Sequence, residues 1–184
     1  MKKSIIVLTG LLLLAAAAAW AEKAPQKVVD LANTTLAAYG TDPVVVAAVK
    51  AQNAKGATLA DIKAMDEKWK GHAGLADYMQ ALMNNECGQH LKNFQKKFGY
   101  IAEIFAMDNQ GANVAMTDKT SDYWQGDEAK FKNSFAGGKG EVFVDEVEFD
   151  DSTQAYLVQV SVPVMDGGQA IGAITFGIDV DQIQ

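Results

Sequence analysis

The feature that most constrains the fold is a change in the spacing of apolar residues near residue 100. Before this point, Val28, Leu31, Thr35 and Leu36 follow helical spacing, which is typical of helices packed on a core. After it, they alternate with polar residues, as in 155–164, which is typical of half-buried strands. The sequence therefore predicts an α+β domain in which helices come first and an antiparallel sheet follows.

Start and stop signals divide the first part into separate helices. Asp42-Pro43 predicts a helix start, because an N-cap acid is followed by proline at the first helical position. Thr58 and Asp61 have the spacing of a capping box. The expected helices are 28–40, 43–56, 59–71 and one or two between Leu75 and Lys97, with an interruption around Cys87-Gly88.

Five segments of the second part have strand periodicity, and they predict a five-stranded sheet. They are 100–107, 112–117, 142–149, 155–164 and 169–179, with a DNQG turn after the first and a short helix at 128–135. In the last hairpin, the apolar rows restrict the register, because a slip by one residue would turn one row outward. The register that we expect pairs Val160 with Ile174, Val158 with Phe176, Gln159 with Thr175 and Ser161 with Ala173, and leaves 166–168 as the loop.

The amino-terminal segment MKKSIIVLTGLLLLAAAAAWA predicts a cleavable signal peptide. It has a basic start, an apolar stretch and a small-x-small site, so cleavage is expected before Glu22. Retention of the segment as an anchor is the alternative. We therefore expect a periplasmic protein with one domain at 22–184, whose helical part is 24–98 and whose sheet part is 100–181.

The charged residues limit the partners of the domain. The formal net charge is −7, and all 16 basic residues are lysines. The acids concentrate after residue 108, and a negative field favours cations or a basic partner over nucleic acid or anionic lipid. Solubility of an exported protein explains the same acidity. A single cysteine, Cys87, excludes an internal disulfide.

The segment TSDYWQGDEAKF at 120–131 places aromatic rings beside carboxylates. Aromatic faces attract cations, and a desolvated carboxylate favours an ammonium donor. Tyr123, Trp124, Asp122 and Asp127 therefore predict a binding cage for a positively charged group. The alternative is that the rings cover the core and the acids cap turns or the short helix.

Several stretches together resemble an extracellular Cache (PDC) domain, the PAS-like sensor fold of bacterial receptors. They are the DNQG turn, TSDYWQGDEAKF and FDDSTQAYLVQVSVPVMDGGQAIGAITFGIDVD, and the chain is most similar to small stand-alone periplasmic members. The resemblance implies a long amino-terminal helix against a five-stranded antiparallel sheet. It also implies a small organic ligand on the other face of the sheet, under the loop between the second and third strands.

The resemblance also implies site residues. In amino-acid-binding members, an arginine and loop aromatics hold the ligand carboxylate, and acids of later strands hold its ammonium group. Asp150 and Asp179 match those acids, but this chain has no arginine, and Lys119 or Lys130 offers only a point charge. We therefore expect an amine, a quaternary ammonium or another small polar ligand. The predicted ligand-binding residues are Tyr123, Trp124, Asp122, Asp127, Asp150, Gln159, Ser161, Thr175 and Asp179.

No catalytic or cofactor motif is visible in the sequence. The acidic cluster at 145–151 lacks the glycine and the final glutamate of an EF-hand loop, and Cys87, His90 and His72 form no recognisable metal motif. We therefore expect no enzyme, cofactor or metal, but a sensor module that signals through a separate membrane receptor or histidine kinase. The alternatives are an interaction module whose pocket is filled and whose amino-terminal helix dimerises, and a hydrolase or metal-dependent enzyme on a PAS-like scaffold.

Overall fold

The structure is a computed structural model that describes residues 22–151 and 153–183. The predicted signal peptide, residues 1–21, lies outside the described residues. Among the helices of the described part, none has both the length and the hydropathy needed to span a membrane.

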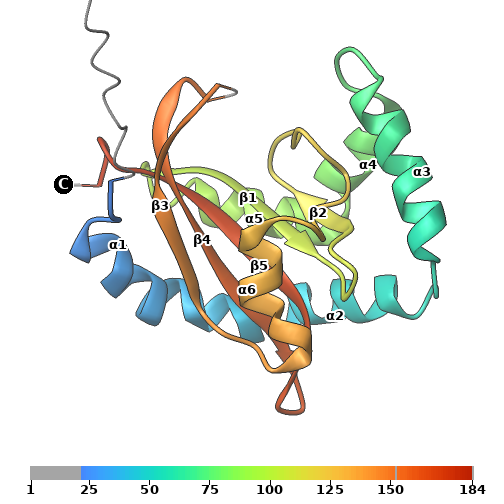
Figure 1. Cartoon of the computed structure of the whole chain (residues 1–184), viewed down its shortest axis with the longest axis horizontal. Helices are drawn as coiled ribbons and strands as arrows, with labels where there is room; N and C mark the ends of the chain where they lie inside the picture. Colours follow the sequence, from blue (N-terminus) through green and yellow to red (C-terminus); the bar gives the residue numbers. More distant parts are fainter. Residues whose placement is uncertain (1–21, 152, 184) are drawn as a thin grey trace, which may run out of the picture.

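A long helical run forms the amino-terminal part of the domain and lies along one face of the sheet (Figure 1). It consists of α1 (Gln26–Leu31), the π-helical turn η1 (Ala32–Leu36), the 3-10 turn η2 (Ala37–Thr41) and α2 (Pro43–Asn53). The predicted start at Asp42 is confirmed, because its carboxylate accepts the N–H groups of Val44 and Val45 at 2.9 and 3.2 Å. The helix expected at 28–40 is also present, but its hydrogen bonding changes from α-helical to π-helical after Leu31 and to 3-10 after Leu36.

Three further helices follow: α3 (Leu59–Lys70), α4 (Asp77–Asn84) and α5 (Glu86–Gln95). The capping box predicted at Thr58 and Asp61 is present at the start of α3. The interruption expected around Cys87-Gly88 is wrong, because both residues lie inside α5. The chain breaks at Asn85 instead, where the side-chain oxygen accepts the Gly88 N–H at 2.7 Å and caps α5.

The five predicted strands form one antiparallel sheet with the order β2-β1-β5-β4-β3. The strands are β1 (Ile101–Met107), β2 (Asn113–Met116), β3 (Phe143–Asp150), β4 (Ala155–Asp166) and β5 (Gln169–Asp179). The predicted short helix is α6 (Ala129–Phe135), which continues into the turn η3 (Ala136–Gly138). The predicted α+β class, with helices packed on a five-stranded antiparallel sheet, is thus confirmed.

The predicted register of the last hairpin is wrong by two residues. Val160 pairs with Phe176 instead of Ile174, and the loop has two residues, Gly167 and Gly168. Both glycines have positive φ, 59° and 87°, which suits a tight two-residue hairpin turn. A bulge after Val164 absorbs the odd residue. Because the shift is even, each side chain keeps its predicted face; the observed pairs are Gln159 with Gly177, Ser161 with Thr175, Val158 with Ile178 and Val162 with Ile174.

The two faces of the sheet are covered by different elements. The run from α1 to α2, together with α5, packs on one face and forms the larger apolar core. A smaller core lies on the other face, which is covered by α6 and by the loop between β2 and α6 (Figure 1). The larger core includes Val28, Leu36, Val45, Val49, Leu91, Phe94, Val158, Val160, Val162, Ile174, Phe176 and Ile178, and the smaller one includes Trp69, Met79, Phe105, Met107, Met116 and Phe131.

Candidate ligand-binding site

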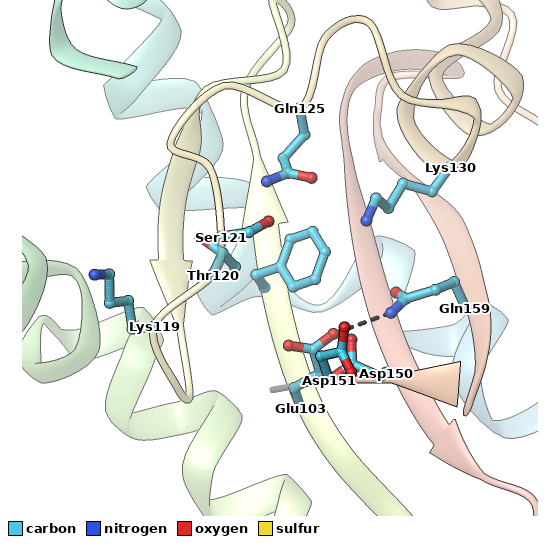
Figure 2. A pocket seen from close by; sticks show the side chains of 10 residues that line it. Glu103, Lys119, Thr120, Ser121, Gln125, Lys130, Asp150, Asp151 and Gln159 are labelled. Carbon is cyan, nitrogen blue, oxygen red and sulfur yellow. Dashed lines mark hydrogen bonds between the residues drawn. The ribbon is translucent and has the colours of Figure 1, made fainter. Parts of the chain in front are cut away.

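A hollow of about 230 Å³ lies between the second face of the sheet and the loop that connects β2 to α6. We call it the polar hollow (Figure 2). The strands supply Glu103 and Phe105 of β1, Asp150 of β3 and Gln159 of β4, while Asp151 follows β3. The loop supplies Lys119, Thr120, Ser121 and Gln125, and α6 supplies Lys130. The sheet and a loop far from it in sequence thus enclose one polar space.

Glu103 is a buried acid that lines the polar hollow. Its residue is 9% exposed, and the Gln159 Nε2 group donates a hydrogen bond to its Oε1 atom at 3.0 Å. Burial raises the pKa of Glu103, and the hydrogen bond from Gln159 only partly opposes this effect. The Gln159 Oε1 atom is buried without a hydrogen-bond partner among the described residues. Both groups are acceptors, so this part of the hollow favours a donor.

The charges in the polar hollow are separated. Figure 2 shows Glu103, Asp150 and Asp151 close together, with Lys130 across the space from them. The Asp150 carboxylate accepts the Thr153 N–H at 2.8 Å, so the turn after β3 fixes its position. The Lys130 Nζ atom lies 5.5 Å from the centre of the Phe105 ring. The hollow therefore has an acidic end and a basic end.

Lys119, the other lysine of the lining, has its ammonium engaged elsewhere. Its Nζ atom donates to the backbone carbonyls of His72 and Gly74, each at 3.1 Å. Both carbonyls belong to the connection between α3 and α4, and in Figure 2 the Lys119 ammonium points away from the carboxylates. Lys130 is therefore the lysine of this lining that faces a guest.

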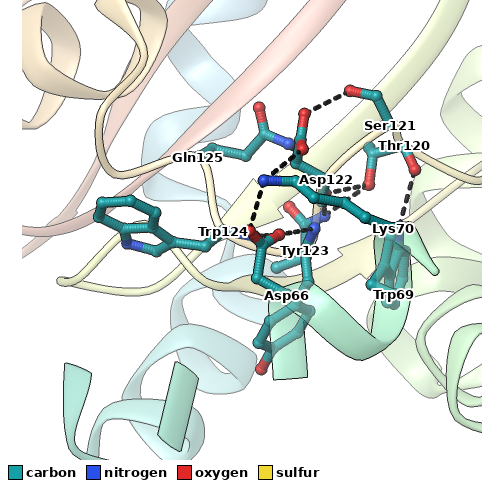
Figure 3. Close-up of polar contacts among 10 residues, drawn as sticks. Asp66, Trp69, Lys70, Thr120, Ser121, Asp122, Tyr123, Trp124 and Gln125 are labelled. Carbon is teal, nitrogen blue, oxygen red and sulfur yellow. Dashed lines mark hydrogen bonds and ion pairs between the residues drawn. The ribbon is translucent and has the colours of Figure 1, made fainter. Parts of the chain in front are cut away.

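A buried acid of α3 holds the loop over the polar hollow (Figure 3). The Asp66 carboxylate, in a residue 3% exposed, accepts the backbone N–H groups of Tyr123 and Trp124 at 2.9 and 3.0 Å. The Lys70 ammonium bridges Asp66 at 2.7 Å and Asp122 at 3.0 Å. Partial burial acts to raise the pKa of Asp122, but the Ser121 hydroxyl and Lys70 outweigh it, so the pKa is lowered.

Further hydrogen bonds hold the same loop from below. The Trp69 indole N–H donates to the Thr120 carbonyl at 2.8 Å. The Asn113 amide, in a fully buried residue of β2, donates to the Thr120 hydroxyl at 2.7 Å and to the Asp122 carbonyl at 3.1 Å. The loop is thus held at several points, and these hydrogen bonds place Thr120 and its neighbours against the hollow.

Two of the nine residues predicted to bind ligand, Asp150 and Gln159, line the polar hollow. Ser161 and Thr175 do not, because both are fully buried and their hydroxyl groups share a hydrogen bond of 2.7 Å. Asp179 lies at the end of β5, where its carboxylate accepts the Asp181 N–H at 2.9 Å. It therefore closes the strand and is not part of this lining.

The four acidic and aromatic loop residues do not form the expected cage. The Tyr123 ring lies 5.6 Å from the Trp69 ring, whereas the Trp124 indole N–H donates to the Gln110 carbonyl at 2.8 Å. Asp122 pairs with Lys70, and Asp127 is exposed. Adjacent side chains of an extended loop point to opposite sides, so these residues cannot all face one space. None of the four lines the polar hollow.

Sequence reasoning missed Glu103, the most buried acid of the site. Its one signal was an isolated acid in the otherwise apolar strand IAEIFAM, which indicates a buried charge with a specific role. Lys130 is among the residues expected from the sequence, as a point charge. The other missed lining residues are Phe105, Thr120, Ser121, Gln125 and Asp151, and no periodic pattern distinguishes them.

The cysteine and histidines lie away from the polar hollow. Burial raises the pKa of the Cys87 thiol to about 12, so it stays protonated. The His90 Nε2 atom lies 2.9 Å from the Asp42 carboxylate at the start of α2. Within residues 22–151 and 153–183, no group of three or more His, Cys, Asp or Glu side chains is placed to hold a metal ion.

The comparisons find sensory domains of similar structure. No family model matches the sequence, and no characterised protein matches it significantly. The sensory domain of the Campylobacter jejuni chemoreceptor Tlp3 is 17% identical, with a TM-score of 0.45 over 88% of this chain and 67% of that chain. The V. cholerae histidine kinase DctB sensor domain is 14% identical, with a TM-score of 0.38 over 86% of this chain and 55% of that chain.

A third similar structure is the ligand-binding domain of the Pseudomonas aeruginosa PAO1 amino acid chemoreceptor PctC in complex with GABA. It is 17% identical, with a TM-score of 0.41 over 84% of this chain and 66% of that chain. This chain also spans 63% of the Tlp3 ligand-binding domain in complex with 4-methylisoleucine. Sequence identities and overlaps this low do not transfer a function, so the function of this chain is inferred from its own residues.

Proposed function

We propose that this chain is a periplasmic sensor module of the Cache type that binds a small ligand with an ammonium group in the polar hollow. A separate membrane receptor or histidine kinase then reads the bound state. The observation that carries this proposal is the buried pair of Glu103 and Gln159, which places a carboxylate and an unpaired amide oxygen against the hollow.

An ammonium group fits these acceptors better than other small groups do. It has three N–H donors and no acceptor, and it can satisfy a carboxylate and an amide oxygen together. A hydrogen bond between two charged groups is about twice as strong as a neutral one. Asp150 and Asp151 add negative charge at the same end of the hollow. The acidic end is therefore the ammonium subsite.

The other end of the ligand faces Lys130. A second ammonium there would be repelled, so the ligand carries a hydrogen-bond acceptor at that end, such as a hydroxyl, a carbonyl or a carboxylate. A lysine supplies a single point charge and not the planar fork that binds a carboxylate in bidentate fashion. We therefore expect contacts with the ammonium group to contribute more to affinity than contacts with the acceptor.

The volume limits the size of the ligand. The hollow measures about 230 Å³. A cavity of about 150 Å³ accommodates benzene, which has six non-hydrogen atoms. By proportion, the ligand has about nine non-hydrogen atoms. Amino alcohols, short diamines with one acylated end and small amino acids are in this range.

A thermal-shift screen with paired compounds tests the proposal. Each amine, such as 4-aminobutanol or γ-aminobutyrate, is compared with its analogue that lacks nitrogen, butanol or butyrate. A ligand at 100 times its dissociation constant adds about 2.7 kcal/mol to the free energy of unfolding. We expect a shift with the amines and none with the analogues. The Glu103→Gln variant should lose the shift, while Lys50→Gln, which removes a surface ion pair with Asp166, should keep it.

The pH dependence of binding is a second test of the same site. Because burial raises the pKa of Glu103, its carboxyl group becomes neutral at a higher pH than an exposed glutamate does. Affinity for an amine should therefore weaken as the pH falls through this raised pKa. Calorimetric titration of the native protein and of Glu103→Gln measures it. Equal amine affinity in the two proteins at neutral pH would refute the assignment.

A further inference from the structure

We propose a second binding site, separate from the polar hollow, which takes a small aromatic carboxylate. It is a hollow of about 180 Å³ among α2, α3, α4 and the far side of the loop. We call it the aromatic hollow. Its walls are Trp69, Tyr78, Tyr123, Met65 and Leu82, and Gln52 and Lys55 also line it. It shares no lining residue with the polar hollow, so this inference does not rest on the proposed function.

The walls suit a planar apolar ring. The ring centre of Trp69 lies 5.6 Å from that of Tyr123 and 6.1 Å from that of Tyr78, with interplanar angles of 39° and 49°. Tyr78 and Tyr123 are half-buried, so parts of their rings face the open space. Aromatic pairs prefer such offset and tilted arrangements, and a further ring can add to them. The volume is slightly above the roughly 150 Å³ that accommodates benzene.

The polar groups of the lining favour an anionic acceptor on that ring. The Lys55 ammonium donates to the Gln52 Oε1 atom at 2.8 Å, and the Gln52 Nε2 group donates to the Tyr123 hydroxyl at 3.5 Å. Each of these bonds points from Lys55 towards Tyr123. The ammonium has three N–H donors, so it has donors to spare for a guest. The Tyr123 hydroxyl accepts from Gln52 and donates to no other described residue, so its own O–H is also able to donate.

The surrounding charges agree with an anion. Burial, together with the charge of Asp108, raises the pKa of Tyr123, so the phenol keeps its proton at neutral pH. Asp108 itself is 2% exposed and accepts the backbone N–H groups of Gln110 and Ala112, so it is not open to a guest. The Lys68 ammonium lies 4.4 Å from the Tyr78 ring. A carboxylate near Lys55 is thus favoured over an ammonium.

The side chains of the loop between β2 and α6 point to opposite sides, so this one segment lines both the polar hollow and the aromatic hollow. Tyr123 points into the aromatic hollow, whereas Ser121 and Gln125 line the polar hollow. Figure 3 shows the Tyr123 ring directed away from Gln125, with Asp66 between α3 and the loop backbone. The aromatic ring that the sequence had suggested for a cation cage therefore forms a wall of a different space.

Calorimetric titration with benzoate and benzylamine tests the proposal. These probes share the ring and differ in the sign of their charge. We expect benzoate to bind and benzylamine to bind at least about tenfold more weakly, the size of one hydrogen bond to a charged group. Met65→Trp fills the hollow and should abolish benzoate binding. Lys55→Gln, at an exposed position, should weaken benzoate binding about tenfold without affecting folding.

Two matched variants control for other lysines. Lys63→Gln removes an exposed ammonium of α3 that lies over Trp124, and Lys130→Gln removes the lysine of the polar hollow. Both should bind benzoate as the native protein does. The proposal is overturned if benzoate does not bind, if benzylamine binds as well, or if Lys55→Gln and Met65→Trp retain native affinity. Loss of benzoate binding in Lys130→Gln alone would also overturn it, because the anion would then occupy the polar hollow.

Discussion

The two faces of the sheet are built by the same strands but differ in polarity. On the face under α1 and α2, Val158, Val160 and Phe176 are fully buried in an apolar core. On the other face, alternate residues of the same strands include Gln159, Ser161 and Thr175. Successive side chains of a strand point to opposite faces. Neighbouring residues of one strand therefore lie alternately in the larger apolar core and on the polar face.

This difference assigns separate tasks to the two faces. The apolar face supplies burial, which is the dominant favourable term in folding. The polar face carries a buried carboxylate and an unpaired amide oxygen, which cost stability and are the groups that a ligand would satisfy. Substitutions on the first face should therefore change stability without changing affinity, whereas on the second face those that alter the lining of the polar hollow or its loop should also change affinity.

The largest effect is expected for Phe176→Ala on the apolar face. Phe176 is fully buried in the larger core, and its ring contacts Tyr39 and Phe94 edge to face. Removal of a core phenylalanine costs about 3–5 kcal/mol of unfolding free energy. Urea denaturation measures the loss. Amine affinity of the folded fraction should not change, and a large change would contradict the separation of the two faces.

The next effect is expected for Asp66→Ala, beneath the loop of the polar face. Two backbone N–H groups would lose their acceptor, and because both bonds are only partly buried, each loss costs about 1–2 kcal/mol, the lower part of the range for an unsatisfied group. Lys70 is half-exposed and can turn to water, so its loss adds little. We expect a loss of about 2–4 kcal/mol together with weaker amine binding, because the loop wall loosens. Denaturation and calorimetry on the same samples measure both. Unchanged affinity would show that the loop does not wall the site.

A smaller effect of opposite sign is expected for Glu103→Gln. The pKa of Glu103 is raised in the folded state, so between the unfolded and folded pKa values the native protein binds more protons than the unfolded one. Stability therefore falls as the pH rises through that window. The variant should lack this slope and be more stable than the native protein at neutral pH. Denaturation curves from pH 4 to pH 8 measure it, and an unchanged slope would contradict the burial argument.

The smallest effect is expected for the hydroxyl pair of the polar face. Ser161→Ala and Thr175→Val should each cost about 1 kcal/mol, because each leaves the other hydroxyl without its partner. The double variant should cost less than the sum, which a double-mutant cycle measures. Amine affinity should not change, since neither residue lines the polar hollow. A loss of affinity would show that both residues contribute to ligand binding, as the sequence predicted.

The fold could largely be predicted from the sequence because its signals are local. The periodicity after residue 100 predicts all five strands, and the capping groups at Asp42 and Thr58 are found where their spacing places them. The hairpin register was missed by two residues, because the apolar rows exclude odd shifts but not even ones. Registers that differ by two residues bury the same apolar rows, and the choice between them depended on Gly167 and Gly168, which allow a two-residue turn in place of the expected three-residue loop.

The site could be predicted only where a strand fixes the direction of a side chain. Gln159 lies on the polar face, as its alternation with Val158 and Val160 requires. The loop at 117–128 has no such period, so the sequence alone does not tell which side of it Tyr123 or Asp122 faces. The direction of these side chains depends on Asp66, more than fifty residues away in the chain, whose carboxylate accepts hydrogen bonds from the loop backbone.

The grip of Asp66 on two consecutive amides has a mechanical consequence. The strip of chain that it holds is the partition between two spaces of unlike polarity, and Trp69 and Lys70 of the same helix hold this strip as well. A tilt of α3 would therefore widen one compartment while narrowing the other. Occupants of the two compartments would then compete for the position of the same partition without ever touching.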